Sequence, residues 1–119
     1  MFVPLNNKTD FKNILGGGVY ESALLGSIRF TKGGNDTFSV EFTYEGKDKE
    51  KLTADNFTAC YGTLTCTGRG WNAINQGYIS SKDYDATTGV LTINCYLHTS
   101  SSVQGTHGAT GSVNIFRIK

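Results

Sequence analysis

The chain has 119 residues and a mass of 12.9 kDa, which is the usual size of a single domain. With 11 basic and 10 acidic side chains, its formal net charge is only +1. This balance argues against a partner held by bulk electrostatics, such as duplex DNA or an anionic membrane. No apolar run is long enough to cross a bilayer. We therefore expect no nucleic-acid partner and no membrane insertion.

Residues typical of strands and turns dominate the composition. Glycine and threonine occur 15 times each, and serine and asparagine 9 times each, whereas good formers of exposed helices are scarce. No helix longer than a turn or two is expected. The composition thus predicts an all-β protein and excludes a coiled coil or a charged disordered chain.

Residues 1–18 are predicted to be a short N-terminal arm that precedes a β-domain at residues 19–119. Thr9 or Asp10 is suited to cap one helical turn, and the three glycines at 16–18 then end it. We expect the arm to dock on a neighbouring subunit or on its own domain. Its candidate anchors are the apolar residues Phe2, Val3, Leu5, Phe11, Ile14 and Leu15.

Alternation of apolar and polar residues predicts two strands at the start of the β-domain. In residues 26–31, Gly26, Ile28 and Phe30 share one face. In residues 38–45 the alternation is clearer, with one face in the core and the other in water. The core face there consists of Phe38, Val40, Phe42 and Tyr44. The charged run 46–51 is typical of a solvated hairpin tip.

The middle of the chain combines a strand with a glycine-rich segment. Residues 57–66 are predicted to form a strand with two apolar faces. Phe57, Ala59 and Tyr61 would lie on one face, and Cys60, Leu64 and Cys66 on the other. Residues 67–77 interrupt the alternation with three glycines and are predicted to be a loop that carries Trp71, the only tryptophan.

The last third contains the clearest hairpin pattern, at residues 78–98. Residues 85–89 supply its turn, in which Gly89 can adopt a left-handed backbone. Along its second strand, Leu91, Ile93, Cys95 and Leu97 are predicted to point inward, and Thr92, Asn94, Tyr96 and His98 outward. Residues 99–111 are predicted to be a long exposed loop, and residues 112–119 a final strand. Six to eight short strands favour an antiparallel β-sandwich, of jelly-roll or immunoglobulin-like type.

The sequence offers no convincing catalytic or metal site. No pair of acidic residues has a spacing that predicts a general acid and base, and neither His98 nor His107 adjoins a nucleophile motif. Cys60, Cys66 and Cys95 lack the C-x-x-C spacing of a zinc site, and a disulfide from Cys95 to one of the other two stays open. We expect no enzymatic activity, cofactor or metal. A deep pocket lined by mutually hydrogen-bonded His98 and acidic side chains would contradict this interpretation.

The segment around Trp71 is a candidate binding site. A flat aromatic ring lies there beside three amides and a tyrosine, and sugars are bound by aromatic stacking together with planar donors and acceptors. These candidate residues are Trp71, Asn72, Asn75, Gln76 and Tyr78. The alternative is that Trp71 fills the core, as a lone tryptophan in a β-sandwich more often does.

Residues 83–97 carry a resemblance to known proteins. Their Tyr84-Asp85, Thr88-Gly89 and Leu91-Thr92-Ile93 segments are similar to hairpins of phage and bacterial surface β-domains. With its polar, glycine-rich composition, the chain resembles the small β-sandwich accessory proteins of tailed-phage virions, namely capsid decoration proteins, head fibres and tail-fibre tips. The resemblance implies a non-enzymatic structural or attachment protein whose partners are other virion proteins or copies of itself in a homo-oligomer.

The expected location follows from the same resemblance. The first ten residues show no secretory signal, although the composition suits an extracellular surface. A virion protein, assembled in the host cytoplasm and released by lysis, reconciles the two observations, as would a secreted domain cut from its signal. A plain cytosolic domain stays open. Two other functions also stay open: a glycan-binding module centred on Trp71, and a cytosolic regulator that binds a partner protein.

Overall fold

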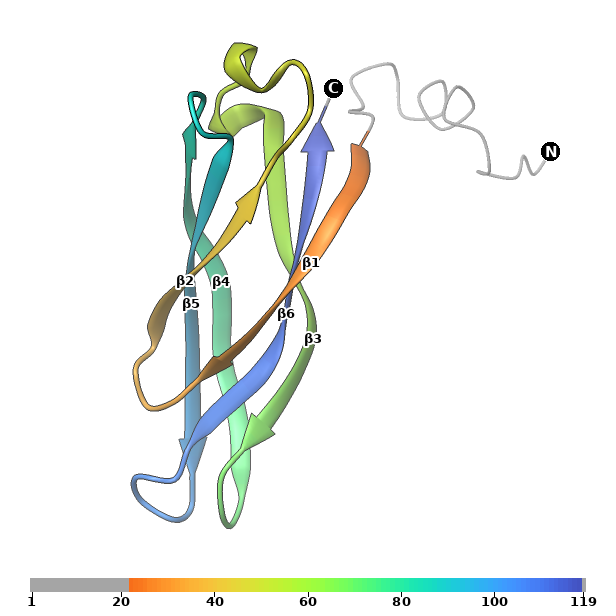
Figure 1. Cartoon of the computed structure of the whole chain (residues 1–119). Coiled ribbons are helices and arrows are strands. Elements are labelled where there is room, and N and C mark those ends of the chain that lie inside the picture. The colour runs from red at the N-terminus through yellow and green to blue at the C-terminus, as the bar shows by residue number, and fades with distance from the viewer. Residues whose placement is uncertain (1–21, 119) are drawn as a thin grey trace, which may run out of the picture.

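The computed structural model describes residues 22–118, which form two packed β-sheets (Figure 1). The predicted N-terminal arm, residues 1–18, lies outside the described residues. The elements are β1 (Ser22–Lys32), β2 (Thr37–Thr43), the 3₁₀ turns η1 (Lys49–Lys51) and η2 (Ala54–Asn56), β3 (Phe57–Thr67), β4 (Asn72–Asp85), β5 (Val90–Ser101) and β6 (Gly108–Ile118). The described chain contains no α-helix, so the prediction of an all-β sandwich is confirmed.

Each sheet has three antiparallel strands. One has the order β1-β6-β3 and the other β2-β5-β4, so β6 and β5 are the central strands. Only β4 and β5 are both consecutive in sequence and neighbours in one sheet. The connection between β2 and β3 crosses from one sheet to the other. The prediction that residues 46–51 form a hairpin tip is therefore wrong, because the flanking strands do not pair.

The core lies between the two sheets. Leu91, Ile93 and Leu97 of β5 face Val113 and Ile115 of β6, and all five have 0% of their surface exposed. The alternating pattern explains this burial, because successive side chains of a strand point to opposite faces. The predicted inward and outward residues of β2 and β5 are confirmed.

Backbone bulges explain where the sequence predictions failed in β3 and β4. β4 begins at Asn72, within the predicted loop, and its register shifts between Ile74 and Gln76. Such a shift inserts an extra residue and destroys the simple alternation. In β3, a shift between Tyr61 and Leu64 places Cys66 opposite the buried Ala109. The prediction that Leu64 and Cys66 face away from Tyr61 is therefore wrong.

The predicted long loop at residues 99–111 is also wrong. β5 continues to Ser101 and β6 begins at Gly108, which leaves only residues 102–107 as a connection. The sequence there is polar, yet Thr99 is only 2% exposed. Threonine suits a strand because of its branched β-carbon, and polar composition alone concealed the strand.

The two ends of the sandwich differ. The turn at residues 85–89 is confirmed: Gly89 has φ of 79° and its N–H donates to the carbonyl of Asp85 at 2.7 Å. The start of β1 and the end of β6 lie side by side, because Ser22 pairs with Ile118, and they are at the same end of the sandwich as this turn (Figure 1). The connections at residues 33–36, 68–71 and 102–107 lie toward the opposite end, which we call the distal end (Figure 1).

Within residues 22–118, no helix is long and apolar enough to cross a membrane.

Candidate functional site

Trp71 lies in the turn between β3 and β4 at the distal end, and 86% of its surface is exposed. The interpretation of Trp71 as a core residue is therefore wrong. Gly68 and Gly70 form this turn with φ of 129° and 75°, a backbone that other residues rarely adopt. The core instead uses phenylalanine and aliphatic side chains, which leaves the largest aromatic side chain in water.

The backbone around Trp71 is held by the neighbouring connection. The Trp71 N–H donates to the Ser102 hydroxyl at 2.8 Å, and the Ser102 N–H donates to the Trp71 carbonyl, also at 2.8 Å. The Thr106 hydroxyl donates to the Val103 carbonyl at 2.7 Å, and the Arg69 N–H donates to that hydroxyl at 3.3 Å. These hydrogen bonds between the two connections hold the backbone of Trp71 in place, so its indole does not project from an isolated loop.

The other four residues of the predicted binding segment do not form one cluster with Trp71. Asn72 shapes the turn, because its amide donates to the carbonyl oxygens of Gly70 at 2.9 Å and Gly68 at 3.3 Å. Its Oδ1 atom is buried without a partner among the described residues. Asn75, Gln76 and Tyr78 follow on β4, where their cross-strand neighbours on β5 determine their surroundings.

Asn75, Gln76 and Tyr78 lie on the outer face of the β2-β5-β4 sheet. Tyr78 pairs with Tyr96, and the two rings stack with centroids 4.8 Å apart and planes 14° from parallel. Tyr78 nevertheless stays 46% exposed. Partial burial, followed by the nearby Asp36 carboxylate, raises the pKa of the Tyr96 phenol. This aromatic pair could not be found from one strand alone, because it depends on the register between two strands.

Beside the tyrosine pair, a chain of polar contacts runs from the surface into the core. His98 Nδ1 lies 3.0 Å from Asp36 Oδ2, and Asp36 Oδ1 lies 3.8 Å from the ammonium of Lys32. That ammonium donates to the Leu97 carbonyl at 2.7 Å and to the Thr99 hydroxyl at 3.1 Å.

The Lys32 side chain has only 1% of its surface exposed. Its burial was missed because the sequence places it at the edge of a predicted turn. The register explains it: Lys32 pairs with Ala109, so it continues the inward face of β1.

A shallow depression of about 330 Å³ adjoins these residues. Hydroxyl, imidazole and amide groups line it: His98, Thr99, Ser100, Ser101, Ser102, Gln104, Gly105 and His107. Asp36 is not part of the lining. The arrangement is an open surface hollow, and not the deep pocket of mutually bonded His98 and acidic side chains that would contradict a contact function.

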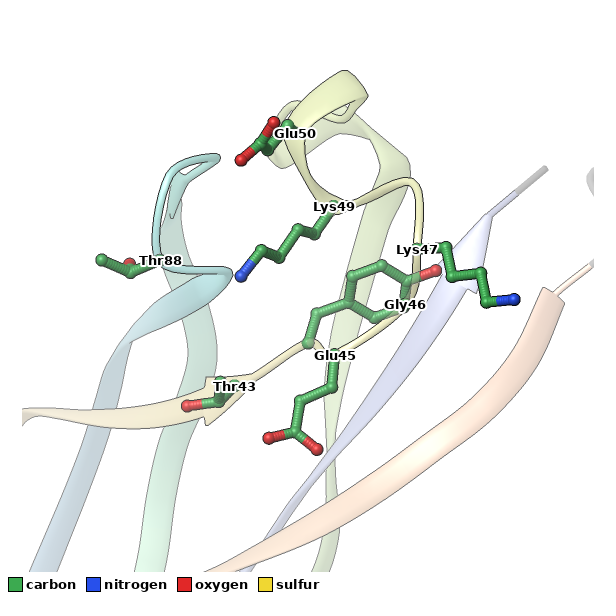
Figure 2. A pocket seen from close by; sticks show the side chains of 8 residues that line it. Thr43, Glu45, Gly46, Lys47, Lys49, Glu50 and Thr88 are labelled. Carbon is green, nitrogen blue, oxygen red and sulfur yellow. The ribbon is translucent and has the colours of Figure 1, made fainter.

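A second hollow, of about 480 Å³, lies at the opposite end of the sandwich (Figure 2). Its lining is Thr43, Tyr44, Glu45, Gly46, Lys47, Lys49, Glu50 and Thr88. Figure 2 shows the Lys49 side chain reaching toward Thr88, while Lys47 points away. Because its lysines and glutamates oppose one another in charge, the hollow offers no strong preference for a charged ligand.

Next to this hollow, Asp48 is bound to the body of the sandwich. It accepts a hydrogen bond from the Tyr44 hydroxyl at 2.7 Å and one from Arg117 at 3.1 Å. The Tyr44 bond, supported by Arg117, lowers the pKa of the Asp48 carboxyl, and the same bond to Asp48 raises the pKa of Tyr44. The charged segment 46–51 therefore has a structural contact that its composition did not predict.

The cysteines are all unpaired. Cys60 is exposed, Cys66 is partly buried, and Cys95 is buried in the core, where burial raises the pKa of its thiol. In the part of the chain that the structure describes, no group of three or more histidine, cysteine or acidic side chains is placed to hold a metal ion.

No family model matches this chain, and no curated protein or solved structure is significantly similar to it. Its function is therefore proposed from the geometry of the distal end and of the adjoining sheet face.

Proposed function

We propose that this protein is a non-enzymatic accessory protein of a bacteriophage particle, such as a decoration, fibre or tail component, that acts through contacts. The observation that carries the proposal is the exposure of Trp71 on a hydrogen-bonded support at the distal end. Large aromatic side chains supply much of the energy of binding interfaces. A rigid support also reduces the entropy that is lost when a partner binds.

The positions of the strand ends support separate roles for the N-terminal arm and the distal end. Because Ser22 pairs with Ile118, any segment before β1 joins the sandwich at the end away from Trp71. In this proposal the N-terminal arm attaches the protein to other virion proteins or to a second copy. The apolar residues named above, Phe2, Val3, Leu5, Phe11, Ile14 and Leu15, would be its anchors. The distal end then stays free to contact a surface.

The test is the presence of the chain in intact particles. Phage particles are purified by sedimentation, and their proteins are identified by mass spectrometry. We expect the full chain and its Trp71→Ala variant to sediment with the particle, and a variant that lacks residues 1–15 to be lost from it. Full incorporation of the shortened chain would refute the role of the arm. Recovery of the chain only with a cytosolic partner would refute the virion assignment.

A further inference from the structure

The outer face of β5 carries a regular row of side chains that leads toward the distal end. Tyr96, His98 and Ser100 project from this face at successive alternate positions, which are about 7 Å apart along an antiparallel strand. The next alternate residue is Ser102, which is hydrogen-bonded to Trp71 through both backbone and side chain. The row therefore spans about 20 Å, from an aromatic pair at one end to Trp71 at the other.

Strand β4 supplies a second set of groups alongside this row. Tyr78 lies opposite Tyr96, and Gln76 lies opposite His98. Because of the bulge after Ile74, Asn75 also reaches this face, where its amide donates to the Ser100 hydroxyl at 2.9 Å. Amides, hydroxyls and an imidazole thus fill the space between the aromatic side chains.

We propose that this strip of the outer face binds a neutral oligosaccharide. We call the strip the glycan track and define it by Trp71, Asn75, Gln76, Tyr78, Tyr96, His98 and Ser100. Sugar rings have an apolar face that packs on aromatic rings and hydroxyl groups at the edge that bond to planar amides. The inference deepens the proposed function and rests on it for its biological setting, because it names what the exposed side of the protein contacts.

The charges of the sheet specify a neutral ligand rather than an acidic one. Glu41, Asp83 and Asp85 lie on the same outer face, in register with Thr92 and Val90 of β5. The single lysine or arginine of β2, β4 and β5 is Lys82, which donates to the Phe57 carbonyl at 2.7 Å. The glycan track itself contains no lysine or arginine, and the Asp36 carboxylate lies 3.0 Å from its His98. The exposed Arg69 adjoins only the Trp71 end. A sulfated or carboxylated sugar would therefore gain little along most of the strip.

The glycan track is also held in place before a ligand arrives. The stacked tyrosine rings fix each other, and the contact between His98 and Asp36 fixes the imidazole. Because these side chains are already restrained, binding loses less conformational entropy than it would on a mobile surface.

The direct test uses the purified full chain on an array of neutral oligosaccharides of increasing length, with sulfated oligosaccharides of matched length for comparison. We expect binding to neutral oligosaccharides, stronger for long than for short ones, and little binding to the sulfated set. A ligand from the array is then titrated calorimetrically into Tyr78→Ala, Trp71→Ala and Gln76→Ala variants. Loss of an aromatic contact should weaken binding about tenfold.

Leu24→Ala is the matched control, because Leu24 is 59% exposed and belongs to the other sheet. It should bind as the unmodified chain does. Thermal unfolding of each variant distinguishes a lost contact from a lost fold, and Gln76→Ala alters no packed side chain. Absence of binding to any neutral oligosaccharide, equal binding of the sulfated set, or full binding by all three track variants would overturn the inference.

These results are independent of the particle experiment. A chain that sediments with phage particles but binds no sugar would leave the proposed function in place and refute the glycan track. A chain that binds neutral sugars but is absent from particles would support the glycan track and refute the proposed function.

Discussion

Thr99→Val replaces the buried hydroxyl that accepts a hydrogen bond from the Lys32 ammonium at 3.1 Å and lies 3.0 Å from His107 Nδ1. The substitution nearly preserves the shape of the side chain, so it changes mainly the polar contact. Water cannot readily take the place of the lost hydroxyl beside the Lys32 ammonium, because Thr99 is 2% and the Lys32 side chain 1% exposed. A hydrogen bond to a charged donor contributes roughly 1.5–3 kcal/mol. We therefore expect Thr99→Val to lower the free energy of unfolding by about 2 kcal/mol.

The measurement is urea unfolding of the two variants Thr99→Val and Thr99→Ser beside the unmodified chain. Serine keeps the hydroxyl and removes one methyl group, at a cost of about 1 kcal/mol. The order of stability should therefore be threonine, then serine, then valine. If the valine variant were as stable as the serine variant or more so, the hydrogen bonds of the Thr99 hydroxyl with Lys32 and His107 would not stabilise the fold and the reasoning would fail.

Three further predictions concern pH and backbone conformation. Because the pKa of Asp48 is lowered in the folded protein, its contribution is present above the unfolded pKa of 3.8 and is lost as pH falls through the lower folded value; Asp48→Asn should therefore show a smaller loss of stability in acid unfolding. Burial raises the pKa of the Tyr61 phenol above its usual 10.0, so the protonated phenol favours the folded state, and this contribution is lost as the pH rises from 10 through the folded value. Tyr61→Phe should therefore lose less stability than the unmodified chain when unfolding is measured in alkali. Gly89→Ala should destabilise the protein more than Gly105→Ala: both have φ near 80°, but a Cβ at Gly89 would meet the Tyr44 carbonyl, whereas at Gly105 nothing lies within 4 Å. Equal melting temperatures for the two alanine variants would contradict the last of these.

Sequence alternation predicted the strands whose pairing is regular. The β2 pattern of Phe38, Val40 and Phe42 matches its inner face, and β5 shows the same agreement from Leu91 to His98. Both lie in one ladder without a register shift. Where a ladder contains bulges, as in β4, period-two reasoning failed because the inserted residue reverses the face of everything that follows.

The candidate site also depends on strand register, which the sequence alone did not predict. The sequence predicted Asn75, Gln76 and Tyr78 as binding residues, and it predicted Tyr96 and His98 to point outward. It could not predict that these two groups share one surface, because the register of β4 on β5 brings them together. The polar chain through Lys32 depends on contacts between residues more than 60 positions apart, which no local pattern carries.

The central position of β6 has a consequence for synthesis of the protein. β1 and β3 pair with β6, and β2 pairs with β5, so all of the first three strands leave the ribosome before their hydrogen-bonding partners are made. β4 and β5, in contrast, can form their hairpin as soon as both have emerged. The β1-β6-β3 sheet therefore cannot be completed until β6 has been translated. This delay, together with the large sequence separation of the paired strands, predicts slow folding. Until the sheet forms, the unpaired strands are exposed to aggregation and proteolysis.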